Sequence, residues 1–373
     1  MKDIFTILAK DPRCEGRLGR VRTFRGEFDT PMFMPVGTKA SVKALDPFDL
    51  KNLGAKIILS NTYHLMLRPG EELVRDLGGL HRFMGWDDPI LTDSGGFQIF
   101  SLKDSTKIGE EGATFRSCYD GTSFSFSPER AIEVQNALGS DIMMCLDECL
   151  AYPAGRSEAE ASAERTLRWA ERSYEVWDEN GPQILFGIAQ GGFHHDLREK
   201  SARDIGSVGF PGHAAGGLAL GEPKEMMLEA IEASFEGLPP DKPRYLMGLG
   251  TPLDILDGIR LGADMFDCVL PTRNARNGQF FTRRGKLNIA NARHGTADLP
   301  PEEGCGCHTC RNFSRAYLRH LFRQREPLFM RLATIHNLHF YLTLVENART
   351  ALQNGDFLCY YSEFGDAYGR GET

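Results

Sequence analysis

The sequence predicts an α/β protein, a parallel (β/α)8 TIM barrel with a zinc-binding insertion after the eighth strand. Eight short apolar segments recur along the chain, and most are followed by a segment with helix start and stop residues. These segments are apolar throughout rather than alternating, as expected for strands buried on both faces of a parallel sheet. A C-x-C-x-x-C run at Cys305, Cys307 and Cys310 predicts the insertion.

The strand candidates and the helices between them follow from this pattern in order. The strands are expected at residues 31–37, 55–61, 89–93, 141–147, 184–190, 213–220, 244–250 and 263–270. Residues 127–139 read as a helix with a Ser cap, Pro at the first turn and a final Gly. Ser157 and Glu160 predict a capping box at the start of the next helix, and residues 251–262 repeat the Thr-Pro start and Gly stop.

Two longer segments interrupt the pattern. Residues 97–126 follow the third strand, and their glycines and β-forming residues predict a hairpin and lid. Residues 271–336 follow the eighth strand and contain the cysteine run and a basic cluster. No low-complexity linker divides the chain, so we expect one domain over residues 1–373 that includes this insertion.

The composition excludes several classes of protein. Of the 373 residues, 41% are hydrophobic and 25% charged, which is typical of a soluble globular protein, and no apolar run could span a bilayer. The N-terminus lacks the features of a signal peptide, and nine cysteines, an odd number, indicate a reducing compartment. We therefore expect a cytoplasmic protein without a membrane partner.

The charge distribution suggests a localised polyanion site. The net charge of −8 argues against a protein that coats nucleic acid indiscriminately. Arginines nevertheless recur every four residues, which predicts a stripe along one helix at Arg311, Arg315, Arg319 and Arg323. Such a stripe is often only a solvated face. These arginines lack matching acids and should repel one another, which favours an external polyanion.

The three cysteines need a fourth ligand to complete a tetrahedral zinc site. His336 lies in a helical stretch downstream and could close the tetrahedron, with His339 and His308 as rivals. A Cys₃His set leaves no position open for water. The metal is therefore expected to be structural.

Polar residues and glycines stand where the predicted strands end, which in a barrel is the end that carries the chemistry. They are Asn61, Asp93, Asp147, Gln190, Gly216-Gly217, Met247-Gly248 and Asp267. Two carboxylates can act as nucleophile and general acid/base, as in retaining glycosyl transfer. A third with Gln190 suits a heterocycle such as guanine. Cys149 and Cys268 have no activating His nearby and are interpreted as pocket lining.

The motifs LTDSGGFQ, LDEC, AQGG, AGGLALGE, YLMGLG, FDCVLPTR and CGCHTC…H occur in this order. With them the chain closely resembles the tRNA-guanine transglycosylases over nearly its whole length. These enzymes exchange guanine at the wobble position of certain tRNA anticodons for a 7-deazaguanine base. The resemblance implies a barrel with a zinc-bearing insertion, in agreement with the pattern above, and a homodimer.

The resemblance also implies roles for individual residues. Asp267 looks like the nucleophile that attacks C1′ of the target ribose, and Asp93 like the general acid/base. The expected base-binding residues are Asp147, Gln190, the backbone of Gly217, the Leu218 carbonyl, and Met247 with Phe97 on the two faces of the ring. Arg273 and Arg276 match the segment that reads bases beside the wobble guanine. Cys305, Cys307, Cys310 and His336 match the family zinc ligands.

Four readings of the function compete. Leu220, where queuine-using members have Gly, predicts the bacterial type that takes 7-aminomethyl-7-deazaguanine (preQ1). The alternatives are a queuine-using enzyme and a catalytically silent zinc-containing tRNA-binding subunit. The presence of both Asp93 and Asp267 argues against a silent subunit. A barrel glycoside hydrolase would need aromatic sugar platforms at the strand ends, where no Trp stands.

Overall fold

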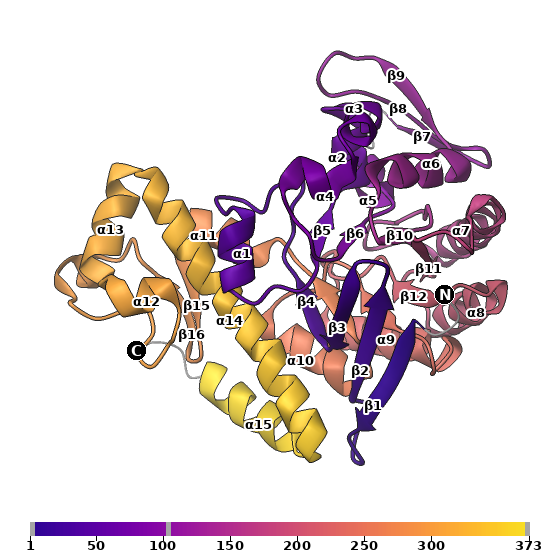
Figure 1. The fold of residues 1–373 in the computed structure, drawn as a ribbon. Coiled ribbons are helices and arrows are strands. Elements are labelled where there is room, and N and C mark those ends of the chain that lie inside the picture. Colours follow the sequence, from indigo (N-terminus) through magenta and orange to yellow (C-terminus); the bar gives the residue numbers. More distant parts are fainter. Residues whose placement is uncertain (1–3, 102–105, 370–373) are drawn as a thin grey trace.

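The structure, a computed structural model, describes residues 4–101 and 106–369 and contains the predicted eight-stranded parallel barrel (Figure 1). Its strands are β4 (Met32–Met34), β5 (Ile58–Ser60), β6 (Ile90–Thr92), β10 (Ile142–Met144), β11 (Ile184–Ala189), β12 (Gly212–Ala215), β13 (Arg244–Leu246) and β14 (Met265–Asp267). They neighbour one another in sequence order, and β14 pairs with β4. A parallel bridge from Val36 to Leu59 joins the first strand to the second. The fold-class prediction is confirmed.

Helices surround this barrel. Those between strands include α1 (Pro47–Asn52), α2 (Thr62–Leu67), α3 (Glu71–Asp76), α4 (Gly79–Met84), α5 (Gly96–Ser101), α6 (Pro128–Leu138), α7 (Arg156–Val176), α8 (His195–Val208), α9 (Lys224–Gly237) and α10 (Pro252–Arg260). After the eighth strand come α14 (Pro327–Asn354) and α15 (Phe357–Tyr368). None of the helices in the described parts of the chain has the length and apolar content needed to cross a bilayer.

Two of the three predicted helix starts are confirmed and one is wrong. The Ser127 hydroxyl accepts from the Arg130 amide at 3.2 Å, and Thr251 caps α10 in the same way. Residue Ser157, in contrast, lies inside α7, which begins one residue earlier, after Gly155, and has no side-chain cap. The predicted capping box therefore does not form, because the helix starts before the capping serine.

The strands are shorter than predicted, which matters most at β12. The predicted strand 213–220 ends at Ala215, and the following residues form a loop at the carboxyl end of the barrel. Gly217 has φ +68° and Ala219 has φ +58°, both in the left-handed region, which a strand cannot accommodate. The apolar run continues because the loop residue Leu218 is itself buried.

No strand was predicted before residue 31, but the structure has an antiparallel sheet there, made of β1 (Phe5–Lys10), β2 (Arg17–Thr23) and β3 (Gly26–Thr30). Val21 and Phe28 join the buried cluster of the barrel interior. Arg17 forms a buried ion pair with Asp264, which directly precedes β14, with Nη2 to Oδ2 at 2.6 Å. The sheet therefore closes the amino-terminal end of the barrel, opposite the predicted chemistry.

The segment after the third strand forms a three-stranded sheet rather than a hairpin. Its strands are β7 (Lys107–Gly109), β8 (Gly112–Arg116) and β9 (Ser123–Phe126). Glu110, in the turn between β7 and β8, accepts from Arg168 through both carboxylate oxygens, and its carbonyl accepts from the Trp169 indole at 2.7 Å. These bonds attach the sheet to α7. Residues 102–105 of the predicted lid lie outside the described residues.

The insertion after β14 forms a lobe beside the barrel (Figure 1). It consists of α11 (Leu270–Arg276), the hairpin β15 (Gln279–Thr282) and β16 (Gly285–Asn288), a 3-10 helix (Ala292–Thr296), α12 (His308–Asn312) and α13 (Arg315–Gln324). The predicted single arginine stripe is wrong, because Phe313 is extended and Ser314 caps a new helix. Arg315 and Arg319 donate to backbone carbonyls of Pro300 and Asn291.

Candidate active site

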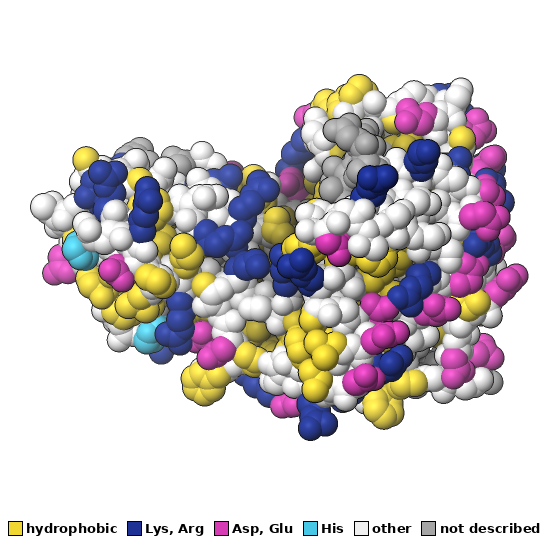
Figure 2. Space-filling model, turned by 90° about the horizontal axis from the view of Figure 1, so that it is seen from above, with side chains coloured by type: hydrophobic (Ala, Val, Ile, Leu, Met, Phe, Trp, Pro, Cys, Tyr) yellow, Lys and Arg dark blue, Asp and Glu magenta, His cyan; other side chains and the backbone are white. Residues whose placement is uncertain are grey.

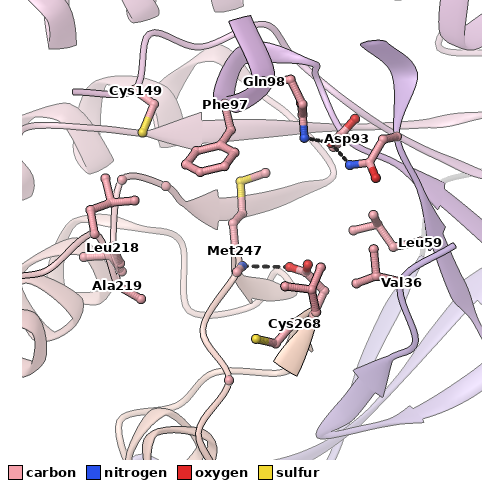
Figure 3. Close-up of a pocket in the computed structure, with 18 of the residues that line it drawn as sticks. Val36, Leu59, Asp93, Phe97, Gln98, Cys149, Leu218, Ala219, Met247 and Cys268 are labelled. Carbon is pink, nitrogen blue, oxygen red and sulfur yellow. Dashed lines mark hydrogen bonds between the residues drawn. The ribbon is translucent and has the colours of Figure 1, made fainter. Parts of the chain in front are cut away.

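A cavity of about 740 Å³ opens at the carboxyl ends of the strands (Figure 3). The predicted strand-end residues follow their strands closely and line this cavity or contact the side chains that do. The predicted site residues in its wall are Asp93, Phe97, Asp147, Gly217, Leu218, Met247, Asp267 and Arg273. Gln190 donates to Asp147 from just behind the wall. The structure thus brings together residues from six strands.

Asp93 lies directly after β6 and is buried. Its Oδ1 accepts from the Thr62 amide at 2.8 Å, and its Oδ2 accepts from the Asn61 and Gln98 side chains. Burial raises the pKa of Asp93 to about 6, against the lowering effect of these donors, and the nearby Asp267 adds to the rise. A carboxyl group with such a pKa can both give and take a proton near neutral pH.

Asp267 is the last residue of β14, and only one of its two carboxylate oxygens accepts hydrogen bonds from the described residues. Its Oδ1 accepts from the Tyr245 hydroxyl at 2.5 Å and from the Gly248 amide at 2.7 Å. Its Oδ2 accepts from no described residue. Burial raises the pKa of Asp267, and the two donors oppose that shift. The geometry fixes the carboxylate while leaving one oxygen available.

Asp147, Gln190 and two glycines form a second polar group in the wall. Asp147 accepts from the Ser94 hydroxyl at 2.8 Å and from the Gln190 amide at 2.7 Å. Burial raises the pKa of Asp147, while these donors lower it. A Cβ on Gly216 or Gly217 would lie within 2.6 Å of the Gln190 side chain, so a larger residue would displace the Gln190 amide. The result is a fixed carboxylate and amide beside exposed backbone.

Apolar side chains face one another across the cavity. Figure 3 shows Phe97 and Met247 pointing toward each other, with Leu218 and Ala219 on one side of them. Phe97 is 50% exposed. Cys149 and Cys268 also line the cavity, and burial raises the pKa of the Cys268 thiol to about 12. The Cys268 thiol is therefore protonated at neutral pH.

The loop after β12 is held by a glutamate. Glu222 accepts from the amides of Ala219 and Leu220, at 2.6 and 2.7 Å. Because the N–H and C=O of a trans peptide point in opposite directions, the Leu218 carbonyl points away from Glu222. The carboxylate thus fixes the orientation of the Leu218–Ala219 peptide in the cavity wall.

Arg273 and Arg276 stand on α11 at the cavity edge. Arg273 is exposed and lines the cavity, whereas Arg276 is half-buried. The Nη1 of Arg276 is buried without an acceptor in the described chain, and burial, together with Arg273, lowers its pKa. The Arg273 guanidinium therefore borders the cavity, and the Arg276 guanidinium has a buried donor without an acceptor among the described residues.

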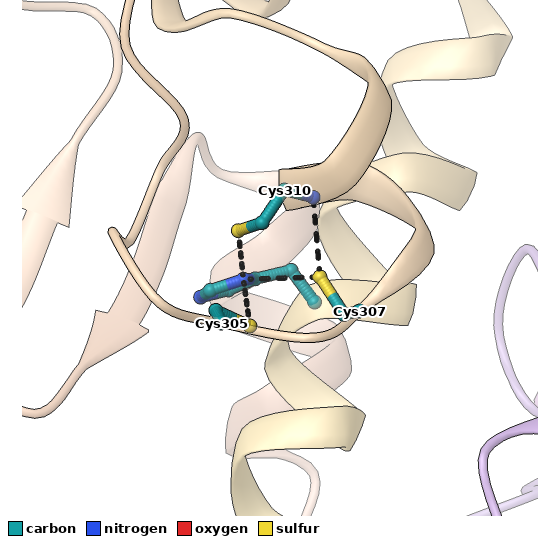
Figure 4. A group of neighbouring side chains, drawn as sticks. Cys305, Cys307 and Cys310 are labelled. Carbon is teal, nitrogen blue, oxygen red and sulfur yellow. Dashed lines mark hydrogen bonds between the residues drawn. The ribbon is translucent and has the colours of Figure 1, made fainter.

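The insertion brings three thiols and an imidazole together (Figure 4). The Nδ1 of His336 lies 3.9, 3.6 and 3.2 Å from the sulfurs of Cys305, Cys307 and Cys310. A tetrahedral ion with metal–sulfur and metal–nitrogen distances of about 2.3 and 2.0 Å would separate S and N by roughly 3.5 Å. The His336 Nε2 lies 2.7 Å from the Phe281 carbonyl, which fixes Nδ1 as the metal-facing nitrogen. The group could hold one metal ion.

The rival ligands do not complete the group. His339 lies 3.9 Å from the Cys305 sulfur and is not part of the four-residue cluster, and His308 contacts Asn312 instead. The four buried or half-buried donors leave no face of the tetrahedron open. This fits a structural ion.

Sequence reasoning missed several residues that the structure places around the carboxylates. Ser94 and Gln98 lie inside the TDSGGFQ motif, Tyr245 opens YLMGLG, and Glu222 ends AGGLALGE. Each belongs to a quoted motif, yet nothing in the sequence alone shows which carboxylate or amide it contacts. Asn61, noted only as a strand end, proves to be a donor to Asp93.

Comparisons with known proteins agree with this site. A sequence model described as queuine tRNA-ribosyltransferase matches residues 11–370. A queuine tRNA-ribosyltransferase of Syntrophobacter fumaroxidans is 56% identical over 95% of this chain and 94% of its own length. Proteins of the same name from Listeria innocua and a Thermoanaerobacter species are 53% and 52% identical, each over 98% of this chain and 96% and 97% of their own lengths.

The match covers both the barrel with its cavity and the insertion with its Cys₃His group. The residues quoted in the motifs above converge on that cavity or on that metal group. The chain therefore belongs to the queuine tRNA-ribosyltransferase family and is a tRNA-guanine transglycosylase, a pentosyltransferase of the queuosine pathway.

Proposed function

We propose that this enzyme exchanges guanine at wobble position 34 of tRNAs with G-U-N anticodons for preQ1, through a covalent intermediate between Asp267 and the ribose. The observation that carries the proposal is the pairing of two unlike carboxyl groups in one cavity. Asp267 has one oxygen fixed by two donors and one free, while the pKa of Asp93 is raised to about 6. These environments suit a nucleophile and a proton carrier.

The reaction divides into two displacements at C1′ of the target ribose. The free oxygen of Asp267 forms a bond to C1′ as the bond from C1′ to N9 of guanine breaks, and the departing base takes the proton of Asp93. The incoming base then gives its N9 proton to Asp93 and attacks C1′, releasing the Asp267 oxygen. Two inversions retain the configuration of the nucleoside.

The second polar group supports recognition of the base. The Asp147 carboxylate can accept from the N1–H and N2–H₂ of a guanine-like ring, while Gln190 and the Gly217 amide can donate to its O6. Phe97 and Met247 would cover the two faces of the ring. The arrangement fits guanine and 7-deazaguanines alike, because all share this edge.

Two features favour preQ1 over queuine. The Leu218 carbonyl points away from Glu222, so it is free to accept from the aminomethyl ammonium of preQ1. Leu220 lines the cavity next to it and fills space that the cyclopentenediol of queuine would need. A queuine-using enzyme is the alternative.

We further propose that the metal is Zn²⁺, that Arg273 and Arg276 contact bases beside the wobble guanine, and that the enzyme is a homodimer. Three thiolates and an imidazole are a set that Zn²⁺ prefers in closed structural sites.

Arg276 has a buried donor without a described acceptor, as a base-reading residue requires in the absence of RNA. Light scattering should give twice the 41.6 kDa mass of one chain.

Incorporation of labelled guanine into tRNA with a G-U-N anticodon tests the reaction. We expect wild-type exchange, a tRNA adduct that survives denaturing electrophoresis, and loss of both in Asp267→Asn with tRNA binding retained. Asp241→Asn, an exposed carboxylate outside the cavity, is the control and should exchange normally. Exchange by Asp267→Asn at the wild-type rate would refute the nucleophile. Binding without any exchange in the wild type would indicate a silent tRNA-binding subunit.

Competition tests the base. We expect preQ1 to block guanine incorporation and queuine to leave it unchanged. Equal competition by queuine would overturn the preQ1 assignment while keeping the reaction. In Leu220→Gly the same assay should show increased competition by queuine, because the substitution removes the side chain that fills the space.

A further inference from the structure

We propose that Lys39, Lys43 and Arg68 form a phosphate-binding site for the RNA backbone, organised by the ring of Tyr119 beside the cavity. This inference rests on the proposed tRNA substrate and adds a contact surface that the catalytic and base-reading residues do not include. It is carried by four observations: the ring contacts of two cations, the lack of ion-pair partners, the position on the barrel and the charge of the opposite rim.

Tyr119 holds two of the cations in place. The Lys39 ammonium donates to its hydroxyl at 3.0 Å, and the Arg68 guanidinium lies over its ring, with Cζ 3.9 Å from the centroid. A cation over an aromatic face is attracted by the ring and loses some of its rotational freedom. The half-buried tyrosine comes from the turn between β8 and β9, so three separate loops meet here.

These cations have no carboxylate partner among the described residues. Lys39, Lys43 and Arg68 form no ion pair with any acid in residues 4–101 and 106–369. Asp120 is close enough for Arg68 to help lower its pKa, after the larger effects of Ser117 and Thr122, but the two form no ion pair. Elsewhere on this chain the usual arrangement differs: Arg168 pairs with Glu110 and Arg172 with Glu129. Unpaired cations held close together repel one another unless an external anion compensates them.

The site adjoins the cavity. His64, which lines the cavity, has its pKa lowered by burial and then by the charges of Lys39 and Lys43, so both ammonium groups lie close to it. Thr38, the neighbour of Lys39, is also in the cavity wall. A polymer whose reacting residue enters the cavity would therefore pass these groups.

The barrel order places the cations along one rim. Lys39 and Lys43 follow β4, and Arg68 follows β5. Strand β4 lies between β14, which precedes Arg273 and Arg276, and β5. The three neighbouring strand ends thus carry an arc of five cations. Figure 2 shows Lys and Arg side chains gathered across the middle of the face seen from above and on the lobe at its left.

The opposite rim is acidic or neutralised. After β10, Glu148 is buried and paired with Arg165. The loop after β12 carries Glu222, and the nearby Lys224 is already paired with Asp254 and Asp257. Figure 2 shows most of the Asp and Glu side chains toward the right-hand edge, interspersed with Lys and Arg. A phosphodiester chain would therefore follow the cationic rim and avoid the other, which gives the bound RNA one orientation.

The test is the salt dependence of RNA binding. The affinity of full-length tRNA with a G-U-N anticodon is measured between about 50 and 200 mM salt for the wild type and for Lys39→Ala/Arg68→Ala. We expect Kd to rise about tenfold and the slope of log K against log salt to become shallower by about 1.4 to 1.8, as for two lost phosphate contacts. At saturating tRNA, kcat should stay near the wild-type value, because the contact binds ground state and transition state alike.

The controls separate this site from general charge effects. Lys200→Ala/Arg203→Ala removes the same two charge types from α8, on residues paired with acids, and should bind as the wild type does. Tyr119→Phe keeps the ring and should retain most of the affinity for tRNA. Tyr119→Ala removes the ring that positions the Arg68 guanidinium and should weaken tRNA binding.

An unchanged Kd and slope in the double variant, with wild-type guanine exchange intact, would overturn this inference and leave the proposed function standing. A shallower slope in an enzyme that binds tRNA but exchanges no guanine would support the phosphate site and refute the proposed reaction. A wild type that binds no tRNA would refute both.

Discussion

At the residue scale, burial raises the pKa of Asp93, Asp147 and Asp267, and the donors around each of these three carboxyl groups oppose that shift. Asp147 is bonded through both oxygens, and so is Asp93, whereas Asp267 is bonded through Oδ1 alone. All three carboxyl groups are buried, so they differ mainly in where their hydrogen-bond donors lie. This placement of donors leaves a free oxygen only on the residue that we assign as nucleophile.

Tyr245→Phe should slow exchange and shift its pH dependence. The variant loses the hydroxyl that donates to Asp267, and a hydrogen bond to a charged group is worth about 1.5–3 kcal/mol, or roughly a 10- to 150-fold fall in kcat. Because this donor lowers the pKa of Asp267, its loss should also move the acid limb of the kcat profile to higher pH. The profile is measured with labelled guanine.

Tyr361→Phe provides the matched control for this variant. Its hydroxyl also donates to an aspartate, the Oδ1 of Asp257 at 2.5 Å, but neither residue lines the cavity. This variant should keep the wild-type pH profile. A purely structural role for Tyr245 would leave the acid limb unmoved.

His213 should make stability depend on pH below neutrality. Neither ring nitrogen has a described partner, and burial, followed by the charges of Lys242 and Arg244, lowers the pKa of His213 to about 4. The unfolded chain, with a pKa near 6.5, binds the proton more readily, so stability is full above that pH and falls as the pH drops toward 4. At pH 5 the loss should be about 2 kcal/mol.

Urea unfolding at pH 7.5 and pH 5 of the wild type and of His213→Leu measures this loss. The variant cannot bind the proton, so its stability should fall less between the two pH values, by about 2 kcal/mol. Equal falls in both proteins would show that His213 does not contribute.

At the element scale, the helix ends show where local sequence signals act. Ser127 and Thr251 cap α6 and α10 because each stands directly before a proline that is well placed in the first turn. Ser157 resembles a cap in sequence but is the second residue of α7. A capping side chain therefore acts only when its residue directly precedes the helix, a position that Gly155 occupies at α7.

Ser127→Ala should destabilise the protein by about 1 kcal/mol, because the Arg130 amide loses its acceptor. Ser157→Ala is the matched control: Ser157 is exposed within α7, and the change should stay within about 0.5 kcal/mol. Urea unfolding at neutral pH measures both. Equal losses would mean that Ser157 caps its helix after all.

At the scale of the whole molecule, α14 joins the insertion to the barrel. Its His336 belongs to the metal group, and its Asn337 bonds to the backbone of α11 and β15 through Pro271 and Gln279. Farther along the same helix, the Tyr341 hydroxyl donates to the Gly250 carbonyl and Arg349 to the Pro31 carbonyl. One helix thus connects the metal group to the barrel.

Metal removal should therefore lower the melting temperature of the enzyme by several degrees, since ions that bind only the folded state stabilise it. Cys310→Ser should contain less metal and show the same loss, measured by elemental analysis and thermal unfolding. Cys359→Ser, an exposed cysteine on α15, should match the wild type. A chelated, metal-free enzyme with an unchanged melting temperature would contradict a structural ion.

Much of the site could be predicted because motif residues at strand ends converge in any barrel. Asp93 directly follows its strand and Asp267 ends its strand, so the topology alone brings them to one cavity. Their partners could not be predicted. Tyr245 contacts Asp267, 22 residues away, from the neighbouring strand, and Glu222 contacts amides 2 to 3 residues away within its own loop. The prediction of one arginine stripe failed because the four-residue spacing of the arginines continues in the sequence across Phe313, where the helix itself ends.

The sequence by itself determined the barrel, the cysteine run and the carboxylates, because apolar strands, metal-ligand spacing and strand-end residues are local patterns. Only the tertiary structure decided which histidine faces the metal, which oxygen of Asp267 is free, and that Lys39 and Arg68 share one ring. The N-terminal sheet that closes the barrel could not be predicted either, because its strands are buried by contacts with distant residues such as Asp264. Contacts between distant segments depend on how loops place side chains, and no local pattern records that.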